Sequence, residues 1–396
     1  MIPALRRPLV LVTLIAAGSL GAQQSQTRDP SLLSVARIFG STDFRGQSFG
    51  PVRWLDDSTY TAVEPAAGGK GVELVRYEAA SGRRSVLVRA AQLTPAGTTE
   101  PLDVEDYDWS SAHDRLLVFT NSGRGGTKAK PSTLQFAKFS PDGRRVAYVR
   151  EHNIYVEQVD YHEVIALTQD GSTTTINGTF DWVYEEELSI RDGFRWSPDG
   201  TRIAYWQLDA KGVRDFLLVN NTDSLYAFVK PVQYPKAGTT NSAARIGVVS
   251  SEGGATTWMK VPGDPRNNYL ARMDWAGPSS ADVTIQQLDR RQRQNTLWLG
   301  DARSGAVRSV LVEKDSAWLD IHDDHDDYGP GPSLHWLTAQ SFLWLSERDG
   351  WRHAYVVRRD GSLQLITKGN YDVVKVVRIA VAGGWLYYYA SPLNGT

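Results

Sequence analysis

A five-residue turn sequence occurs twice in this chain. Phe139-Ser-Pro-Asp-Gly143 recurs as Trp196-Ser-Pro-Asp-Gly200, and each copy is followed by a basic residue and a short apolar run. Proline presets φ for the second turn position, while aspartate and glycine suit the next ones, so the chain can reverse tightly between two strands. The pattern therefore predicts β-hairpins over both copies rather than helices.

Weaker copies of this pattern occur along the rest of the chain. In each, an aromatic residue closes a short strand ahead of a polar turn and another apolar run; these residues are Trp54, Trp109, Trp275 and Trp336. Many short strands with regular turns and little helical periodicity favour a β-propeller over a sandwich or an α/β sheet. The amphipathic stretch from Ser31 to Ile38 predicts one short helix ahead of the strands.

The amino terminus has the features of a secretory signal peptide. Arg6 and Arg7 precede an apolar run from Leu9 to Ala17, and small residues follow as far as Ala22. The apolar run is short for a membrane span, so we expect a signal peptide over residues 1–22 and a secreted or periplasmic protein without a membrane span after cleavage. An uncleaved membrane anchor is the alternative.

The composition excludes several classes of site. The chain of 396 residues has a formal net charge of −2, and its charged residues are spread along the sequence without a long basic run, so nucleic acid is not an expected partner. It contains no cysteine, which excludes disulfides, zinc-thiolate sites and cysteine nucleophiles. No cofactor is predicted, and peptides or small molecules are the expected ligands.

One segment between the two Ser-Pro-Asp-Gly turns has no counterpart elsewhere in the chain. It is Asn177-Gly-Thr-Phe-Asp-Trp-Val-Tyr-Glu-Glu-Glu-Leu188. Asp181 is a candidate N-cap, which would place the three glutamates in the opening turns of a short helix. Consecutive helical residues point about 100° apart, so at most two of the three carboxylates can converge on one cation. The segment thus predicts either a site for a cation or a solvated acidic turn.

At this segment the chain resembles the dipeptidyl peptidase IV family of serine peptidases, whose propeller carries an Asp-Trp-x-Tyr-Glu-Glu-Glu motif. Further family-like stretches lie on both sides of the motif: Arg37-Ile-Phe-Gly40, Arg191 to Gly200, Tyr205-Trp-Gln-Leu-Asp209, Asn220 to Tyr226, Tyr234-Pro-Lys-Ala-Gly238 and Ser346 to His353. The resemblance covers essentially the whole chain after the signal peptide. It implies an eight-bladed propeller in the full family member.

The resemblance also implies roles for the residues of the motif. In that family the second and third glutamates bind the free α-ammonium of the peptide substrate, which assigns this role to Glu186 and Glu187. Because the substrate amine would be held at a fixed distance from the nucleophile, the family enzyme would release dipeptides whose second residue is proline or alanine. The expected supports of the glutamates are Asp181, Trp182, Tyr184 and Glu185.

The chemistry of this family needs a Ser-His-Asp triad, with its serine in a Gly-x-Ser-x-Gly elbow on an α/β-hydrolase domain. The one pentapeptide of this form, Gly46-Gln-Ser-Phe-Gly50, lies ahead of the predicted propeller strands and not in an α/β-hydrolase domain. We therefore expect that the catalytic domain is absent, that no catalytic residue can be assigned and that the chain alone is inactive. The expected organisation is a signal peptide (1–22), a lead-in segment (23–50) and a propeller (51–396) that is incomplete at its last blade.

Two further segments offer candidate sites. Between Ser122 and Phe136 the family has extra strands and a substrate-binding arginine, whereas this chain has a glycine-rich stretch in which Arg124 is the sole candidate. A loop charge is the alternative interpretation of Arg124. His322-Asp-Asp-His-Asp-Asp-Tyr328 contains metal-ligand types, but its spacing is typical of an exposed loop, so no metal is predicted.

The resulting hypothesis is the substrate-recognition propeller of a secreted dipeptidyl peptidase IV-like enzyme. Its expected partners are the amino terminus of a peptide and either a hydrolase domain or a second subunit. The main alternative is a stand-alone propeller that binds peptides or proteins without chemistry. A scaffold associated with polysaccharide or the cell envelope is a third possibility, and it would make no use of the glutamates.

Overall fold

The computed structural model describes residues 33–41, 43–44, 46, 50–120, 134–321 and 334–391. The chain divides into two compact units, residues 1–50 and 51–396. In the first unit, helix α1 (Val35–Gly40) begins after Ser34, whose Oγ accepts a hydrogen bond from the backbone N–H of Arg37 at 3.1 Å. The sequence predicted this helix from Ser31, and the observed start is later because the Ser34 cap defines it.

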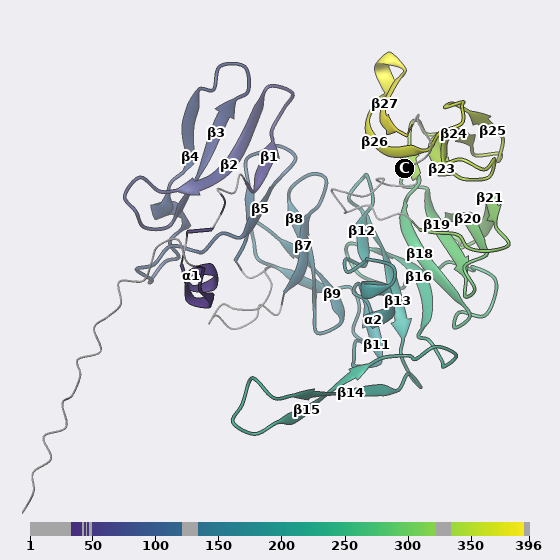
Figure 1. The fold of residues 1–396 in the computed structure, drawn as a ribbon, viewed down its shortest axis with the longest axis horizontal. Coiled ribbons are helices and arrows are strands. Elements are labelled where there is room, and N and C mark those ends of the chain that lie inside the picture. Colours follow the sequence, from purple (N-terminus) through teal and green to yellow (C-terminus); the bar gives the residue numbers. More distant parts are fainter. Residues whose placement is uncertain are drawn as a thin grey trace, which may run out of the picture. The chain divides into compact units, whose positions relative to one another are not determined.

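Among the described residues of the second unit, five sheets each have four or five antiparallel strands (Figure 1). Three of them have four strands each. They are β1 (Val52–Trp54), β2 (Thr59–Pro65), β3 (Val72–Glu78) and β4 (Arg84–Val88); β7 (Gln135–Phe139), β8 (Arg145–Arg150), β9 (Asn153–Gln158) and β10 (Val164–Ala166); and β18 (Asn268–Trp275), β19 (Asp282–Asp289), β20 (Gln294–Asp301) and β21 (Val307–Lys314).

A fourth four-stranded sheet and a five-stranded sheet complete the larger sheets. They contain β22 (Leu334–Trp336), β23 (Ser341–Ser346), β24 (His353–Arg358) and β25 (Leu363–Leu365), and β11 (Thr175–Asn177), β12 (Phe194–Trp196), β13 (Arg202–Asp209), β16 (Ala243–Ser250) and β17 (Thr257–Trp258). Three two-stranded sheets are formed by β5 (Asp106–Trp109) and β6 (Leu116–Phe119), β14 (Asp215–Asn220) and β15 (Phe228–Gln233), and β26 (Val373–Ala380) and β27 (Trp385–Ala390). Short 3-10 turns lie at Ala90–Leu93 and Val381–Gly383.

The predicted hairpin turns are confirmed in detail. Each aromatic residue of the repeat is the last residue of its strand, namely Trp54, Trp109, Phe139, Trp196, Trp275 and Trp336. In the first full copy, Ser140 Oγ donates to Asp142 at 2.5 Å and accepts from the backbone N–H of Arg145 at 3.0 Å. Gly143 has φ +70°, a left-handed conformation that favours glycine. Local hydrogen bonds therefore account for the turn sequence.

The arginine and tryptophan of the repeat also join one sheet to the next. The Arg145 guanidinium donates to the carbonyl of Gly200, in the next turn of the same type, at 2.8 Å and lies 5.5 Å from the Trp196 ring. In return, Trp196 Nε1 donates to the carbonyl of Lys138 at 3.3 Å. Arg202 and Trp275 repeat this arrangement one sheet further along, with hydrogen bonds to Ser280 and Arg195. The repeat therefore specifies contacts between sheets as well as turns.

Replacing Arg145 by methionine should lower the free energy of unfolding by about 2 kcal/mol, because the Gly200 carbonyl and the Ser251 hydroxyl both lose a charged donor. The neighbouring Arg144→Met variant is the matched control, since Arg144 is exposed. Urea denaturation followed by circular dichroism measures both. Equal stability of the two variants would show that the contact between the sheets contributes little.

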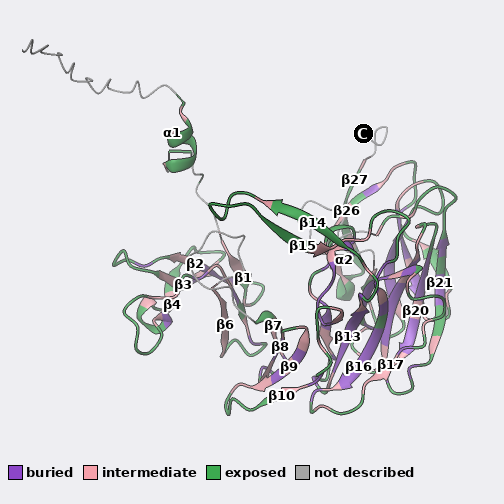
Figure 2. Ribbon diagram, turned by 90° about the horizontal axis from the view of Figure 1, so that it is seen from below, coloured by how far each residue is buried: buried purple, intermediate pink, exposed green. Residues whose placement is uncertain are grey.

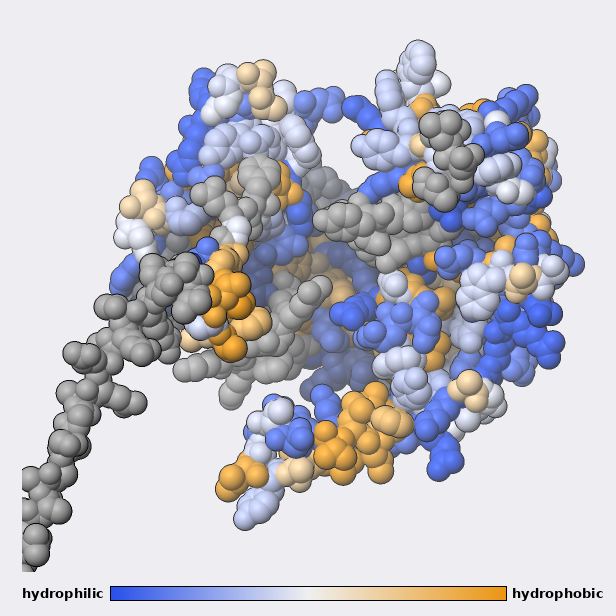
Figure 3. All heavy atoms as spheres, viewed as in Figure 1, coloured by the Kyte–Doolittle hydropathy of each residue, from blue (hydrophilic) through white to orange (hydrophobic). Residues whose placement is uncertain are grey.

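The core of the second unit is formed by the central strands of these sheets. Its largest cluster lies around Trp206, Ile246, Leu270 and Ile285, on β13, β16, β18 and β19. Of these strands, Figure 2 labels β13 and β16, which are coloured largely as buried. Hairpin β14–β15, in contrast to these buried strands, is exposed to solvent. Its apolar residues are exposed (Figures 2 and 3), among them Phe216, Leu217, Leu218, Val219, Phe228 and Val229. Within the described residues, no helix has the length and apolar character to cross a membrane.

Candidate functional site

The segment between the two Ser-Pro-Asp-Gly turns forms helix α2 (Trp182–Glu186). Asp181 is its N-cap, as predicted, and its Oδ1 accepts a hydrogen bond from the backbone N–H of Tyr184 at 3.2 Å. Its second oxygen accepts from the hydroxyl of Ser242 at 2.6 Å. Burial raises the pKa of Asp181 above its ordinary value, against the effect of these hydrogen bonds. The cap therefore fixes both the start of the helix and its position against β16.

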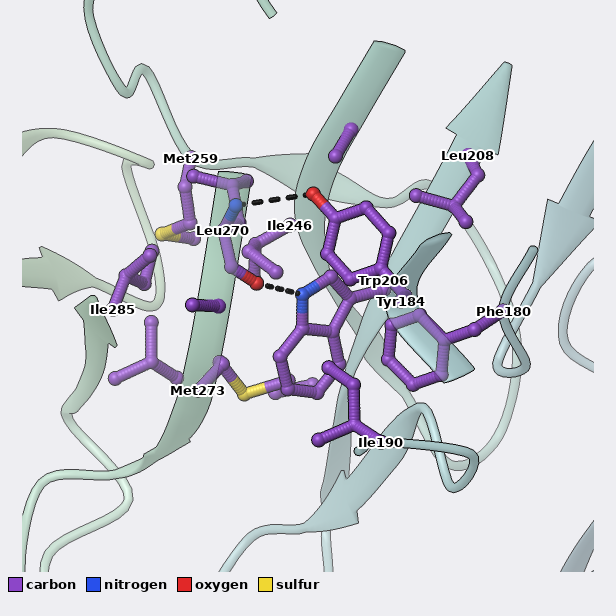
Figure 4. Packing of buried hydrophobic residues seen from close by; sticks show 14 of the residues in the cluster. Phe180, Tyr184, Ile190, Trp206, Leu208, Ile246, Met259, Leu270, Met273 and Ile285 are labelled. Carbon is purple, nitrogen blue, oxygen red and sulfur yellow. Dashed lines mark hydrogen bonds between the residues drawn. The ribbon is translucent and has the colours of Figure 1, made fainter. Parts of the chain in front are cut away.

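Two aromatic side chains anchor α2 to the core. The Tyr184 hydroxyl accepts a hydrogen bond from the backbone N–H of Leu270 at 3.1 Å, and the adjacent Leu270 carbonyl accepts one from Trp206 Nε1 at 2.8 Å (Figure 4). The Tyr184 ring also stacks on Phe180, and burial raises the pKa of its hydroxyl. On the outer side, Trp182 contacts the Tyr234 ring with centroids 4.2 Å apart.

The three glutamates lie at the carboxyl end of this anchored helix. Glu185 and Glu186 form its last turn, and Glu187 follows as the C-cap, with its backbone N–H bonded to the carbonyl of Val183. Burial raises the pKa of Glu185, whose side chain is 38% exposed, while that of Glu186 is 50% exposed. Glu187 is exposed, and no hydrogen bond or ion pair joins its carboxylate to another described residue. The side chains of Glu186 and Glu187 are thus both exposed to solvent.

The chain then turns back over the helix. Ser189 adopts a left-handed conformation with φ +52°, and the backbone N–H of Ile190 donates to the carbonyl of Tyr184 at 3.1 Å. This turn places the Arg191 guanidinium 3.6 Å from Glu186 and 4.0 Å from Glu185. The site therefore already contains one basic group of its own.

The residue after Arg191 is held by a second ion pair. Lys138 Nζ donates to both oxygens of Asp192 at 2.6 Å and to the Phe194 carbonyl at 2.6 Å. Burial lowers the pKa of Lys138 to about 8, although the Asp192 carboxylate opposes this shift. Arg195 lies 3.4 Å from Asp192 on the other side. The backbone beside Arg191 is consequently well fixed.

Sequence reasoning identified the helix, its cap and its three glutamates, but it missed Ser242, Lys138 and the pairing of Arg191. Ser242 is 61 residues from Asp181 along the chain and Lys138 is 54 from Asp192. No local pattern marks either of them, because the contact depends on how separate sheets pack. A signal for Arg191 was present, since a basic residue follows the acidic run within one helical turn of its end.

A hollow of about 660 Å³ lies beside Trp182 at the base of hairpin β14–β15. Its lining is largely apolar and includes Phe216, Leu218, Val232 and Tyr234, with Lys236 at its edge. Trp182 and Glu186 are four residues apart, so they share a face of α2. The face of the helix that carries one of the predicted glutamates is therefore bordered by apolar surface.

Three predicted features lie outside the described residues. They are the signal peptide over residues 1–22, Arg124 and the His322–Tyr328 stretch, so the structure places none of them. Among the residues that the structure does describe, no group of three or more histidine or acidic side chains is arranged to hold a metal ion.

The family model described as the dipeptidyl peptidase IV (DPP IV) N-terminal region matches residues 103–394. Dipeptidyl aminopeptidase B of Saccharomyces cerevisiae is 31% identical in an alignment of 301 residues, and the match covers 69% of this chain and 36% of that protein. Inactive dipeptidyl peptidase 10 of Mus musculus is 27% identical in an alignment of 274 residues, and the match covers 67% of this chain and 34% of that protein. The chain thus spans about a third of the length of these curated relatives.

A solved structure supports the same assignment. The crystal structure of Porphyromonas gingivalis dipeptidyl peptidase 4 matches with a TM-score of 0.73 and 25% identity, over 86% of this chain and 49% of that one. The match and the nearly all-β architecture confirm the predicted propeller-type fold. By its sequence and its fold, this chain belongs to the family of dipeptidyl peptidase IV N-terminal regions.

Proposed function

We propose that this chain is the substrate-recognition propeller of a secreted or periplasmic dipeptidyl peptidase IV-like serine exopeptidase. In this proposal Glu186 and Glu187 bind the free α-ammonium of a peptide whose second residue is proline or alanine. The observation that carries it is the motif Asp181–Glu187, held by a buried cap and a buried tyrosine so that two neighbouring carboxylates remain exposed.

The chemistry of the amine suits this arrangement. An ammonium group has three N–H donors, and carboxylates accept charge-assisted hydrogen bonds from it that are stronger than neutral ones. Because Asp181 and Tyr184 fix the helix, the ordering cost of the site is met on folding rather than on binding. An acetylated or internal peptide offers no cation and loses these bonds.

The proposal gives the propeller a positioning role rather than a chemical one. The nucleophile, its base and the oxyanion hole belong to the hydrolase part of the enzyme in this scheme. Holding the amino terminus at a fixed point would place the second peptide bond at the nucleophile, so the length of the released product follows from geometry.

Calorimetric titration of the mature chain with an Xaa-Pro peptide and with its N-acetylated twin tests the proposal. We expect the free amine to bind and the acetylated peptide to bind at least about tenfold more weakly, since each charge-assisted hydrogen bond contributes about 1.5 kcal/mol or more. Equal affinity for the two peptides would contradict recognition of the amine.

A second candidate function is that of a binding propeller without peptidase chemistry. The observation in its favour is that one relative of similar identity is an inactive dipeptidyl peptidase. Extending the same titration to longer internal peptides distinguishes the two functions. A pure binding module would retain internal peptides, whereas an amine-dependent site would not.

A further inference from the structure

Arg191 is the basic side chain that the structure brings to the glutamates. Its guanidinium lies 3.6 Å from the carboxylate of Glu186 and 4.0 Å from that of Glu185. The ion pair with Glu186 uses one of the two groups to which the proposed function assigns the substrate amine. The same carboxylate therefore has two possible cationic partners.

The backbone keeps Arg191 in this place. On its amino-terminal side, Ile190 is buried and its N–H is bonded to the Tyr184 carbonyl. On its carboxyl-terminal side, Asp192 is held by Lys138 and Arg195. The Gly193 N–H then donates to the Gly178 carbonyl at 3.0 Å. These contacts hold the backbone on both sides of Arg191, which keeps its guanidinium within side-chain reach of the glutamates.

The pairing is weak enough to be exchanged. The Arg191 side chain is 64% exposed and that of Glu186 is 50% exposed. Exposed ion pairs at this separation contribute little to stability, because water screens them and two long side chains must be ordered. An incoming ammonium can therefore replace the guanidinium at Glu186, while Arg191 remains near Glu185.

We infer that Arg191 is the resident counter-cation of the glutamate segment and competes with the α-ammonium of the substrate for Glu186. This inference rests on the proposed function of Glu186 and Glu187. In the ligand-free protein Arg191 offsets the repulsion among the adjacent carboxylates. On binding it yields Glu186 to the substrate, so it tunes how tightly a free amino terminus is held.

The test compares Arg191→Met, Arg191→Lys and wild type, with Arg144→Met as a control for the loss of one positive charge. Arg144 is exposed and lies in the turn between β7 and β8. Calorimetry with the free-amine Xaa-Pro peptide should give about two- to fivefold tighter binding to Arg191→Met, the range expected when one exposed ion pair is removed. Arg191→Lys should remain close to wild type because it keeps the competing charge.

A second measurement needs no ligand. Carboxyl NMR titration should show that the pKa of Glu185, already raised by burial, rises further in Arg191→Met, since the guanidinium favours the ionised form. Thermal melting shows that the variants are folded. An unchanged Glu185 titration would mean that Arg191 is not paired with the segment in solution, which overturns the inference.

The peptide titrations separate failure of the inference from failure of the proposed function. If wild type discriminates the free amine and Arg191→Met binds it equally or more weakly, the inference is wrong and the glutamate clamp stands. If only Arg191→Met binds the amine, both are supported and the competition is strong. If neither protein distinguishes the free amine from its acetylated twin, both are wrong.

Discussion

The Glu186→Gln/Glu187→Gln variant should bind a free-amine Xaa-Pro peptide about 100-fold more weakly than wild type does. Each charge-assisted hydrogen bond to the amine should contribute about 1.5 kcal/mol to the binding free energy. This is the lower end of the usual range, because both carboxylates are exposed in the ligand-free protein. Each single variant should lose about tenfold. Calorimetric titration of the purified protein gives these values.

The design separates charge from shape. Glutamine keeps the size of each side chain and one carbonyl oxygen, so what is lost is the negative charge. Glu100→Gln is the matched control, because Glu100 is exposed and lies outside helix α2. The acetylated peptide should bind the double variant and wild type alike. A double variant that still prefers the free amine would place amine recognition at other residues.

The largest effect on stability is expected at Trp206. Trp206→Ala should lower the free energy of unfolding by about 4 kcal/mol, the typical cost of deleting a large buried aromatic side chain. Trp206 is only 1% exposed, and its ring centroid lies 5.2 Å from that of Phe180. Its Nε1 donates a hydrogen bond to the Leu270 carbonyl (Figure 4). Because Leu270 also binds Tyr184, the loss should loosen the support of α2 as well.

A second substitution at Trp206 separates the contribution of the hydrogen bond from that of the aromatic ring. Trp206→Phe keeps an aromatic ring but leaves the Leu270 carbonyl without its donor, so it should cost about 2 kcal/mol. Trp54→Ala serves as the control, since Trp54 is 61% exposed and should lose less than about 1 kcal/mol. Urea denaturation followed by far-ultraviolet circular dichroism measures all three. A Trp206→Ala protein as stable as the control would show that this cluster repacks without loss.

The glutamate segment illustrates how a site can be specified at two levels. The helix itself depends on Asp181, which is adjacent in sequence, and could be predicted from it. The position of the helix depends on Ser242 and Leu270, which are distant in sequence. Removing Asp181 or its distant partners should affect the position of the glutamates, but only Asp181 can be recognised from the local sequence.

The strand ends, the hairpin turns and helix α2 could all be predicted from the order of the residues. These features depend on residues within a few positions of one another: proline and glycine set the backbone angles, and the side chains of Ser140 and Asp181 bond to nearby amides. Alternating short strands and repeated turns were enough to favour a propeller, and the resemblance at Asp181–Glu187 was enough to suggest its family.

Which of these elements meet depends on the packing of the folded chain. Packing places Arg145 against the turn of the next sheet, Lys138 beside Asp192 and Arg191 beside Glu186. Where an arginine or lysine finds its partner depends on the relative placement of backbone segments, and burial together with desolvation determines which pairs form. The sequence lists the charged groups, but the packing of the sheets selects their partners.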